Sequence, residues 1–195
     1  MELDFNIFKI EYNKVAPKKG RILVSEPFLQ DNYFKRSIVL LTEHSSEGAV
    51  GFVLNKPLDL KVSEVMNDFP DMEMPVSIGG PVSTHTIHYI HTLGTKIPDS
   101  VHVYNNIYWG GDFDFIKDLI HGGNLSSHEI RFFLGYSGWQ AGQLETELEQ
   151  NSWVITELEP NKIMYPEMND WKETLSQLGN KYKIWANFPE NPGQN

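Results

Sequence analysis

A serine flanked by small residues is the first candidate for chemistry in this sequence. Residues 135–139 read GYSGW, and a nucleophile elbow requires G-x-S-x-G because its strained turn leaves no room beside the serine. Trp139 fills the last glycine position, and all seven histidines precede Ser137, whereas an α/β-hydrolase places its histidine after the serine. We therefore interpret GYSGW as a sharp bend at which small residues let Trp139 pack against a sheet, and not as a nucleophile.

Three histidines at regular spacing raise the question of a metal site. His85, His88 and His91 would share roughly one face of a helix and could then hold zinc or nickel. In a strand, His85 and His91 would lie on one face about 20 Å apart, and His88 would lie on the other. The Thr, Ile and Tyr residues of this segment favour a strand, so we expect no bound metal.

A pair of glycines precedes an acidic helix start at residues 109–115, which read WGGDFDF. Free N–H groups after Gly110 and Gly111 could cradle a phosphate. Asp112, however, stands at the expected N-cap, where its carboxylate satisfies those donors and repels an anion. Magnesium binding by Asp112 and Asp114 is an alternative that the pattern leaves open, but capping is the role that we expect.

Four polar residues lie near the ends of the most apolar strands. We expect residues 37–44 and 49–55 to form a hairpin; Arg36 precedes the first segment, Glu43 and His44 end it, and Asn55 ends the second. Both strands are apolar on both faces, so they should lie centrally in a sheet and be covered on each side. We expect the four polar side chains to line a cleft between hairpins.

The pattern along the chain alternates strands and helices without βαβ regularity. We therefore predict an α+β fold with a strongly twisted, mostly antiparallel or mixed sheet flanked by helices, in a single domain over residues 1–195. Residues 1–19 are expected to be a lead-in and 188–195 a loose tail. Strands are predicted at 21–27, 37–44, 49–55, 74–82, 85–93, 101–111 (with a turn), 129–136, 152–158 and 182–188, and helices at 4–10, 61–69, 112–121, 142–150 and 169–179.

Composition excludes several classes of function. The 195 residues contain no cysteine, which rules out disulfides and thiolate metal sites and suits the reducing cytoplasm. The formal net charge of −10 argues against direct binding to nucleic acid. The longest apolar runs are too short to cross a membrane, and the first residues lack the apolar core of a secretory signal.

Five strings in the same order resemble one family of bacterial proteins. They are GRILVSEPFLQDNYFKRSIVLLTEHSSEGAVGFVLNKPL, PVSIGGPV, IYWGGDFD, RFFLGYSGWQAGQLETEL and WVITE, and together they are similar to the YqgE/AlgH family over residues 20–187. The resemblance implies a compact α+β domain with a twisted, mixed sheet. The family is largely uncharacterised, and the AlgH name implies a proposed role in transcriptional regulation.

The resemblance also bears on the individual residues. It marks Gly110, Gly111 and Asp112, as well as Gly135, Gly138, Trp139, Gly142 and Gln143. Alanine is common in the family where this chain has Ser137, which implies that the hydroxyl is not an essential nucleophile. Of the three histidines, only His91 fits the family pattern.

We thus expect a non-enzymatic binding or regulatory protein of the bacterial cytoplasm, without a cofactor or metal, whose partner is an unidentified small molecule or protein. A hydrolase that uses Ser137, His44 or Asp112 is the alternative, and direct DNA binding is a third class that the charge disfavours. The candidate binding surface comprises Arg36, Glu43, His44, Asn55, Gly110, Gly111, Asp112, Gly135, Ser137, Trp139 and Gln143.

Overall fold

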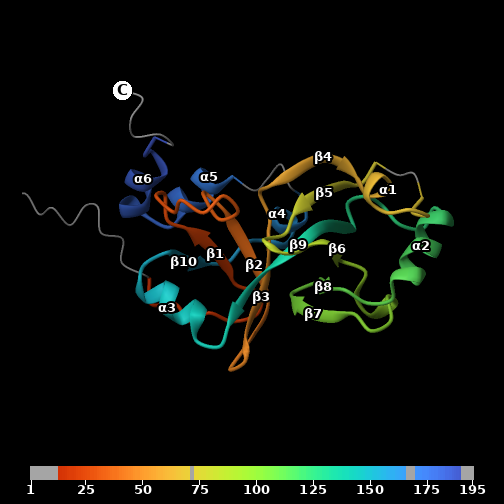
Figure 1. Ribbon diagram of the computed structural model, residues 1–195, viewed down its shortest axis with the longest axis horizontal. Helices are drawn as coiled ribbons and strands as arrows, with labels where there is room; N and C mark the ends of the chain where they lie inside the picture. Colours follow the sequence, from red (N-terminus) through yellow and green to blue (C-terminus); the bar gives the residue numbers. More distant parts are fainter. Residues whose placement is uncertain (1–12, 71–72, 166–169, 190–195) are drawn as a thin grey trace, which may run out of the picture.

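The hairpin of β2 (Ile38–Ser45) and β3 (Gly48–Val53) lies within a large sheet, as its apolar sequence predicts. The computed structural model describes residues 13–70, 73–165 and 170–189 (Figure 1). Within these ranges the sheet has ten strands, and its main path runs β10-β1-β2-β3-β9-β6-β8-β7. The other strands are β1 (Ile22–Ser25), β4 (Pro57–Lys61), β5 (Pro75–Ile78), β6 (Val82–His91), β7 (Val101–Tyr104), β8 (Ile107–Trp109), β9 (Ile130–Gln140) and β10 (Trp153–Thr156).

Helices cover this sheet on both faces and at one end (Figure 1). Every pair of adjacent strands is antiparallel except β5 and β9, so the predicted α+β fold with a mixed, mostly antiparallel sheet is confirmed. The helices are α1 (Val62–Val65), α2 (Phe113–His121), α3 (Gln143–Glu149), α4 (Pro160–Met164), α5 (Trp171–Gln177) and α6 (Asn180–Ala186), with a 3-10 turn at Gly94–Lys96. No helix in the described residues is both long and apolar enough to cross a membrane.

Strand β9 belongs to both halves of the sheet. Its first part pairs with β5 on one side and β6 on the other, and its last four residues pair with β3. The two parts meet at Gly135, whose φ of +66° is left-handed. A methyl group there would lie 2.7 Å from the Val82 carbonyl oxygen and 2.8 Å from that of Gly80. Main chain therefore crosses main chain at this point, which excludes any side chain.

Side-chain alternation along the strands builds a separate core on each face. Ile22 and Ile38 face α5 and α6, where Trp171 and Trp185 complete one cluster of buried residues. Leu23 and its neighbours on the other face pack against α3. A third cluster lies under α1 and α2 in the other half of the molecule. Each face of the sheet is thus covered, as expected for strands with apolar residues on both faces.

Buried Arg131, near the start of β9, ties this strand to two other segments. Its guanidinium donates to the main-chain carbonyls of Leu54, after β3, and of Ile163, in α4, the latter at 2.6 Å. The side chain is only 3% exposed, and its charge lies 5.1 Å from the ring of Phe133. Because hydrogen bonds to a charged donor are strong, Arg131 fixes the chain just before Asn55.

Three local predictions are wrong. The GYSGW segment is not a sharp bend, because β9 continues through it to Gln140 with pairing on both sides of Gly135. Residues 182–188, expected as a strand, belong largely to α6, since Tyr182, Trp185 and Ala186 have helical spacing and pack inward. The helix expected over 61–69 is a single turn, α1. Strand β4 and helix α4 were not predicted, and the helix expected at 4–10 lies outside the described residues.

The crossing at Gly135 makes a first prediction about stability. Alanine at Gly135 should lower the free energy of unfolding by roughly 3 kcal/mol or more, because left-handed strain and a clash with two carbonyls combine. Alanine at Gly142 is the matched control: its φ is +75°, but a methyl group there meets nothing within 4 Å. Strain alone should cost about 1 kcal/mol in that variant. Urea unfolding of both variants measures the difference, and equal costs would contradict a crowded crossing.

Candidate functional site

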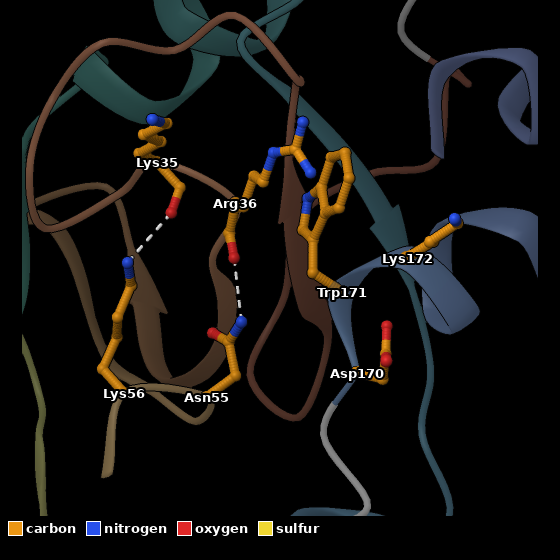
Figure 2. A pocket seen from close by; sticks show the side chains of 7 residues that line it. All are labelled: Lys35, Arg36, Asn55, Lys56, Asp170, Trp171 and Lys172. Carbon is orange, nitrogen blue, oxygen red and sulfur yellow. Dashed lines mark hydrogen bonds between the residues drawn. The ribbon is translucent and has the colours of Figure 1, made fainter. Parts of the chain in front are cut away.

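One cavity gathers positively charged side chains on an otherwise acidic protein. It has a volume of about 440 Å³ and opens between the β1–β2 connection, the β3–β4 connection and the start of α5 (Figure 2). We call it the basic pocket. Four cationic groups and one carboxylate line it, although the whole chain carries −10. Its residues are Lys35, Arg36, Asn55, Lys56, Asp170, Trp171 and Lys172.

The backbone at the centre of this pocket is strained and held in place. Arg36 has a φ of +49°, a left-handed conformation that is uncommon for residues other than glycine. The side-chain amide of Asn55 donates to the Arg36 carbonyl at 2.8 Å and accepts from the Ile38 N–H at 2.9 Å. One side chain thus closes both ends of the turn, which explains how the strain persists.

A main-chain hydrogen bond and an aromatic contact help to position the Arg36 guanidinium. It donates to the Phe188 carbonyl at 2.6 Å and lies 5.0 Å from the Trp171 ring (Figure 2). The Trp171 indole in turn donates to the Ser25 carbonyl on β1 at 2.9 Å. Stacking on a buried aromatic face holds a guanidinium in one orientation while it keeps its full charge.

The lysines surround this pair from separate segments. Figure 2 shows Lys35 on one side of Arg36 and Trp171, and Lys172 on the other. The Lys56 ammonium donates to the Lys35 carbonyl at 3.1 Å. No hydrogen bond or ion pair holds the ammonium groups of Lys35 and Lys172 among the residues that the structure describes. Asp170 caps α5 by accepting from the Glu173 N–H at 2.9 Å. The pocket can therefore offer several cationic donors to a phosphate or carboxylate.

Only two of the four residues expected in a polar cleft meet here. Arg36 and Asn55 line the basic pocket, whereas Glu43 lies with Trp139 beside a smaller cavity of about 140 Å³. His44 lies beside α3, where its Nε2 is 2.8 Å from Glu145 Oε1, and it lines neither of these two cavities. The structure thus divides the expected cleft, because β2 carries Glu43 and His44 to the opposite end from Arg36.

Trp139 and Gln143 are engaged around α3. One oxygen of the Glu147 carboxylate accepts from the indole N–H of Trp139 at 2.9 Å and from that of Trp153 at 2.8 Å. Gln143 accepts from the Gln140 N–H and donates to Glu147. Trp139 is buried among Phe34 and Trp153, so the expectation that it packs against the sheet is met.

Ser137 is enclosed in the sheet and is fully occupied there. The side chain is 0% exposed, and its hydroxyl donates to the Gly79 carbonyl at 2.9 Å. That carbonyl also accepts from the Val53 N–H at 2.9 Å. A hydroxyl in this position ties β9 to the main chain between β5 and β6, and solvent has no access to it.

The histidines and the paired glycines lie in the other half of the molecule. His85, His88, Gly110 and Gly111 line a second cavity of about 410 Å³. These histidines lie in a strand, as predicted, and a register shift between Val82 and Ile87 in the pairing of β6 with β9 interrupts the regular alternation between His85 and His88. His91 is buried, and its Nε2 donates to the Gly110 carbonyl at 3.1 Å.

Burial sets the protonation of this region. It lowers the pKa of His88, and it lowers that of His91 although the Gly110 carbonyl opposes the shift. Burial, with the nearby Asp112 carboxylate, raises the pKa of Tyr89 to about 12. Asp112 caps α2 as predicted by accepting from the Phe115 N–H at 3.0 Å. Among the residues described, no group of three His, Asp or Glu side chains could hold a metal.

Sequence reasoning did not identify the lysines or Trp171 of the basic pocket. These residues come from three segments of the chain, and no spacing within one segment indicates that they converge. Within the sequence, only Arg36 and Asn55 indicated this pocket, because they are polar residues at the ends of apolar strands.

The position of Ser137 leads to a second prediction. Alanine at this position should cost about 1 kcal/mol of unfolding free energy, because Val53 still donates to the Gly79 carbonyl when the hydroxyl is lost. Thermal and urea unfolding measure this cost. A variant that keeps its stability but loses a ligand-binding or hydrolytic activity would show instead that the hydroxyl has a functional role.

Comparison with known sequences and structures places the chain among bacterial proteins. The model of the AlgH-like family matches residues 22–183. A UPF0301 protein of Bacteroides fragilis is 45% identical over 197 residues, covering 100% of both chains. A UPF0301 protein of Chlorobium limicola is 41% identical and covers 95% of this chain and 98% of its own.

Two solved structures share the fold. The AlgH protein from Pseudomonas aeruginosa matches with a TM-score of 0.70 at 25% identity, over 90% of this chain and 97% of that one. A protein from Corynebacterium diphtheriae matches with a TM-score of 0.73 at 24% identity, over 96% and 100% respectively, which speaks for the fold. The resemblance found in the sequence is confirmed, and the chain belongs to the AlgH-like family.

Proposed function

We propose that this protein is a non-enzymatic binding protein whose ligand is a small molecule bearing phosphate or carboxylate groups, held in the basic pocket. The observation that carries this proposal is that four basic residues of an acidic chain, Lys35, Arg36, Lys56 and Lys172, line one cavity. Four cationic groups line the pocket with the single carboxylate of Asp170, so the lining carries a net positive charge and an anion would be stabilised there.

The strained turn supports a binding role. Residues in sparsely populated backbone conformations cost free energy and are typical of sites where a ligand is held. Arg36 combines such a conformation with a clamp from Asn55 and a stack on Trp171, and all three line the same cavity. A pre-ordered guanidinium pays little entropy when it receives an anion.

A hydrolase receives no comparable support. The three residues considered for catalysis are each engaged in separate places: Ser137 inside the sheet, His44 with Glu145, and Asp112 at the cap of α2. A nucleophile and its base must lie within hydrogen-bond reach of each other. We therefore favour binding, and with it a regulatory role in which ligand occupancy is sensed by a protein partner.

The size and charge of the site favour a small ligand over nucleic acid. A cavity of about 440 Å³ is within the range of small-molecule sites. The surrounding chain carries −10, which would repel an extended phosphate backbone. We propose that this role is carried out in the bacterial cytoplasm. A chain without cysteine cannot form the disulfides that stabilise many proteins of oxidising compartments.

Anion titration tests this proposal. Inorganic phosphate, pyrophosphate and citrate are added to ¹⁵N-labelled protein at low salt, and shifts of the Arg36, Asn55 and Lys172 amides are followed. The double variant Lys35→Glu/Lys172→Glu should weaken binding about tenfold or more, because two attractive charges become repulsive. Binding should also weaken as salt is raised, since these ammonium groups are accessible to counterions.

The matched control is Lys18→Glu/Lys96→Glu, which makes the same change in net charge at exposed lysines outside the pocket. Its affinity should change by less than about threefold if the local charges decide binding. An equal loss of anion affinity in both double variants would show that the net charge of the protein, and not the charge of the pocket, decides binding. If none of the three anions shifts the pocket amides, and an acidic peptide does, the ligand is a protein segment and the small-molecule proposal fails.

A further inference from the structure

The basic pocket offers its ligand almost no apolar surface. Of the residues that line it, only Trp171 has an aromatic side chain, and none is an apolar aliphatic residue. Trp171 is itself only 4% exposed, because its ring belongs to the core cluster that α5 and α6 complete. An apolar group gains free energy only where it leaves water for an apolar surface. The part of the ligand that enters this pocket is therefore polar, which disfavours aromatic acids and fatty acids.

Charge is distributed unevenly within the basic pocket. The β1–β2 and β3–β4 connections contribute the cationic residues Lys35, Arg36 and Lys56 to its lining and no carboxylate. The start of α5 contributes Asp170 and Lys172, whose formal charges cancel. Figure 2 shows the lysines of the two connections on one side of the pocket and the two α5 residues on the other. The pocket thus has a cationic side and a side without net charge.

The cationic side matches a phosphate monoester. Such a group carries roughly −1.5 to −2 charges at neutral pH and has three oxygens that accept hydrogen bonds. The hydrogen bond from the Lys56 ammonium to the Lys35 carbonyl, at 3.1 Å, keeps that ammonium next to the strained turn. The Arg36 guanidinium is held 5.0 Å from the Trp171 ring. Three cationic groups exceed the charge that one carboxylate of a ligand would neutralise, so we expect a phosphate on this side.

The α5 side presents an acceptor and a donor that are not bonded to each other. Asp170 caps α5 through Oδ1, which accepts from the Glu173 N–H at 2.9 Å. Within the described part of the chain, Asp170 Oδ2 and the Lys172 ammonium have no hydrogen-bond or ion-pair partner. A carboxylate only accepts hydrogen bonds and an ammonium only donates them, whereas a hydroxyl group does both. Neighbouring hydroxyl groups of a ligand can therefore donate to Asp170 and accept from Lys172.

We propose that the ligand of the basic pocket is the phosphate monoester of a small polyol or sugar. Its phosphate contacts Lys35, Arg36 and Lys56, and its hydroxyl groups contact Asp170 and Lys172. The cavity volume of about 440 Å³ is within the range of small-molecule sites. This inference rests on the function proposed above and adds the chemical class of the ligand. It also gives Asp170 a role besides capping α5, because its carboxylate selects hydroxyl groups although its charge opposes the phosphate.

Three phosphates test this inference. They are sn-glycerol 3-phosphate, n-propyl phosphate, which has the same carbon chain without the hydroxyl groups, and inorganic phosphate. Each is titrated into ¹⁵N-labelled protein at low salt while the amides of Arg36, Asn55 and Lys172 are followed. We expect glycerol 3-phosphate to bind about tenfold more tightly than n-propyl phosphate, because its hydroxyl groups form hydrogen bonds with charged partners. n-Propyl phosphate should bind about as tightly as inorganic phosphate, because the pocket has little apolar surface for its chain.

The variant Asp170→Asn separates selection of hydroxyl groups from attraction of the phosphate. Asparagine is also a good N-cap residue, so α5 should keep its stability, which thermal unfolding checks. The variant should bind n-propyl phosphate about twofold more tightly or better, because a carboxylate that repels the phosphate is lost. Its preference for glycerol 3-phosphate over n-propyl phosphate should fall from about tenfold to less than about threefold, because the acceptor for the hydroxyl groups is lost.

The matched control is Asp118→Asn, which removes the same charge from an exposed residue of α2 outside the pocket. It should change each affinity by less than about twofold and leave the preference between the two esters as it is. If Asp170→Asn changes both affinities by the same factor, Asp170 acts only as a charge or as a helix cap, and its assignment to the hydroxyl groups is overturned.

Failure of this inference can be told apart from failure of the proposed function. If inorganic phosphate and n-propyl phosphate shift the pocket amides and glycerol 3-phosphate binds no more tightly, the inference is overturned and the function stands. If none of the three phosphates gives a saturable shift up to about 10 mM, the inference is overturned, and citrate then decides whether the pocket binds anions at all. Displacement of glycerol 3-phosphate by vesicles of phosphatidylglycerol, at equal concentration of headgroups, would assign the pocket to a lipid and overturn the monoester.

Discussion

The crossing of main chain at Gly135 is the constraint on which the rest of this structure depends. Strand β9 serves both halves of the sheet only because the loop between β5 and β6 can approach it without intervening side chains. A methyl group on Gly79 would lie 2.2 Å from the Gly135 carbonyl oxygen, and one on Gly80 would lie 2.4 Å from that of Tyr136. Ser137 adds its hydrogen bond at the same place. The small residues of GYSGW thus follow from crowding of the backbone, and the buried serine is part of that packing.

The basic pocket depends on this strand through Arg131. Its guanidinium, near the start of β9, holds the carbonyl of Leu54, and the next residue, Asn55, closes the turn at Arg36. The other hydrogen bond of Arg131, to Ile163, ties down α4. A buried charge that donates to main-chain carbonyls costs less free energy than an isolated one, and it fixes the direction of the segments that it joins. The position of the strained turn is therefore set from inside the sheet.

Part of the fold could be predicted from the sequence, in each case from a pattern within one short segment. The β2–β3 hairpin follows from two apolar runs around a short turn, and α2 follows from its cap at Asp112 and its apolar stripe. The continuous path of β9 could not be predicted, because glycines at a bend and glycines at a close crossing look alike in one sequence. Residues 182–188 are rich in aromatic residues, which favours a strand, but in the structure they lie mostly in α6 and pack with α5 in one core cluster.

The candidate sites could be predicted only where local chemistry marks them. Arg36 and Asn55 stood out as polar residues beside apolar strands, and Gly110 and Gly111 as a pair before a helix. Lys172 joins the basic pocket from a helix far along the chain, and no spacing within the sequence indicates that it does. The basic pocket and the second cavity nevertheless share walls with one core: Phe52 on β3 contacts His88 and Trp109, and the same strand leads to Asn55. A close-packed core of this kind does not deform gradually. Contact through Phe52 alone therefore gives no reason for occupancy of one cavity to alter the affinity of the other cavity for a ligand. Coupling would require a second arrangement of β3, and the hydrogen bonds of Arg131 and Asn55 at its end work against one.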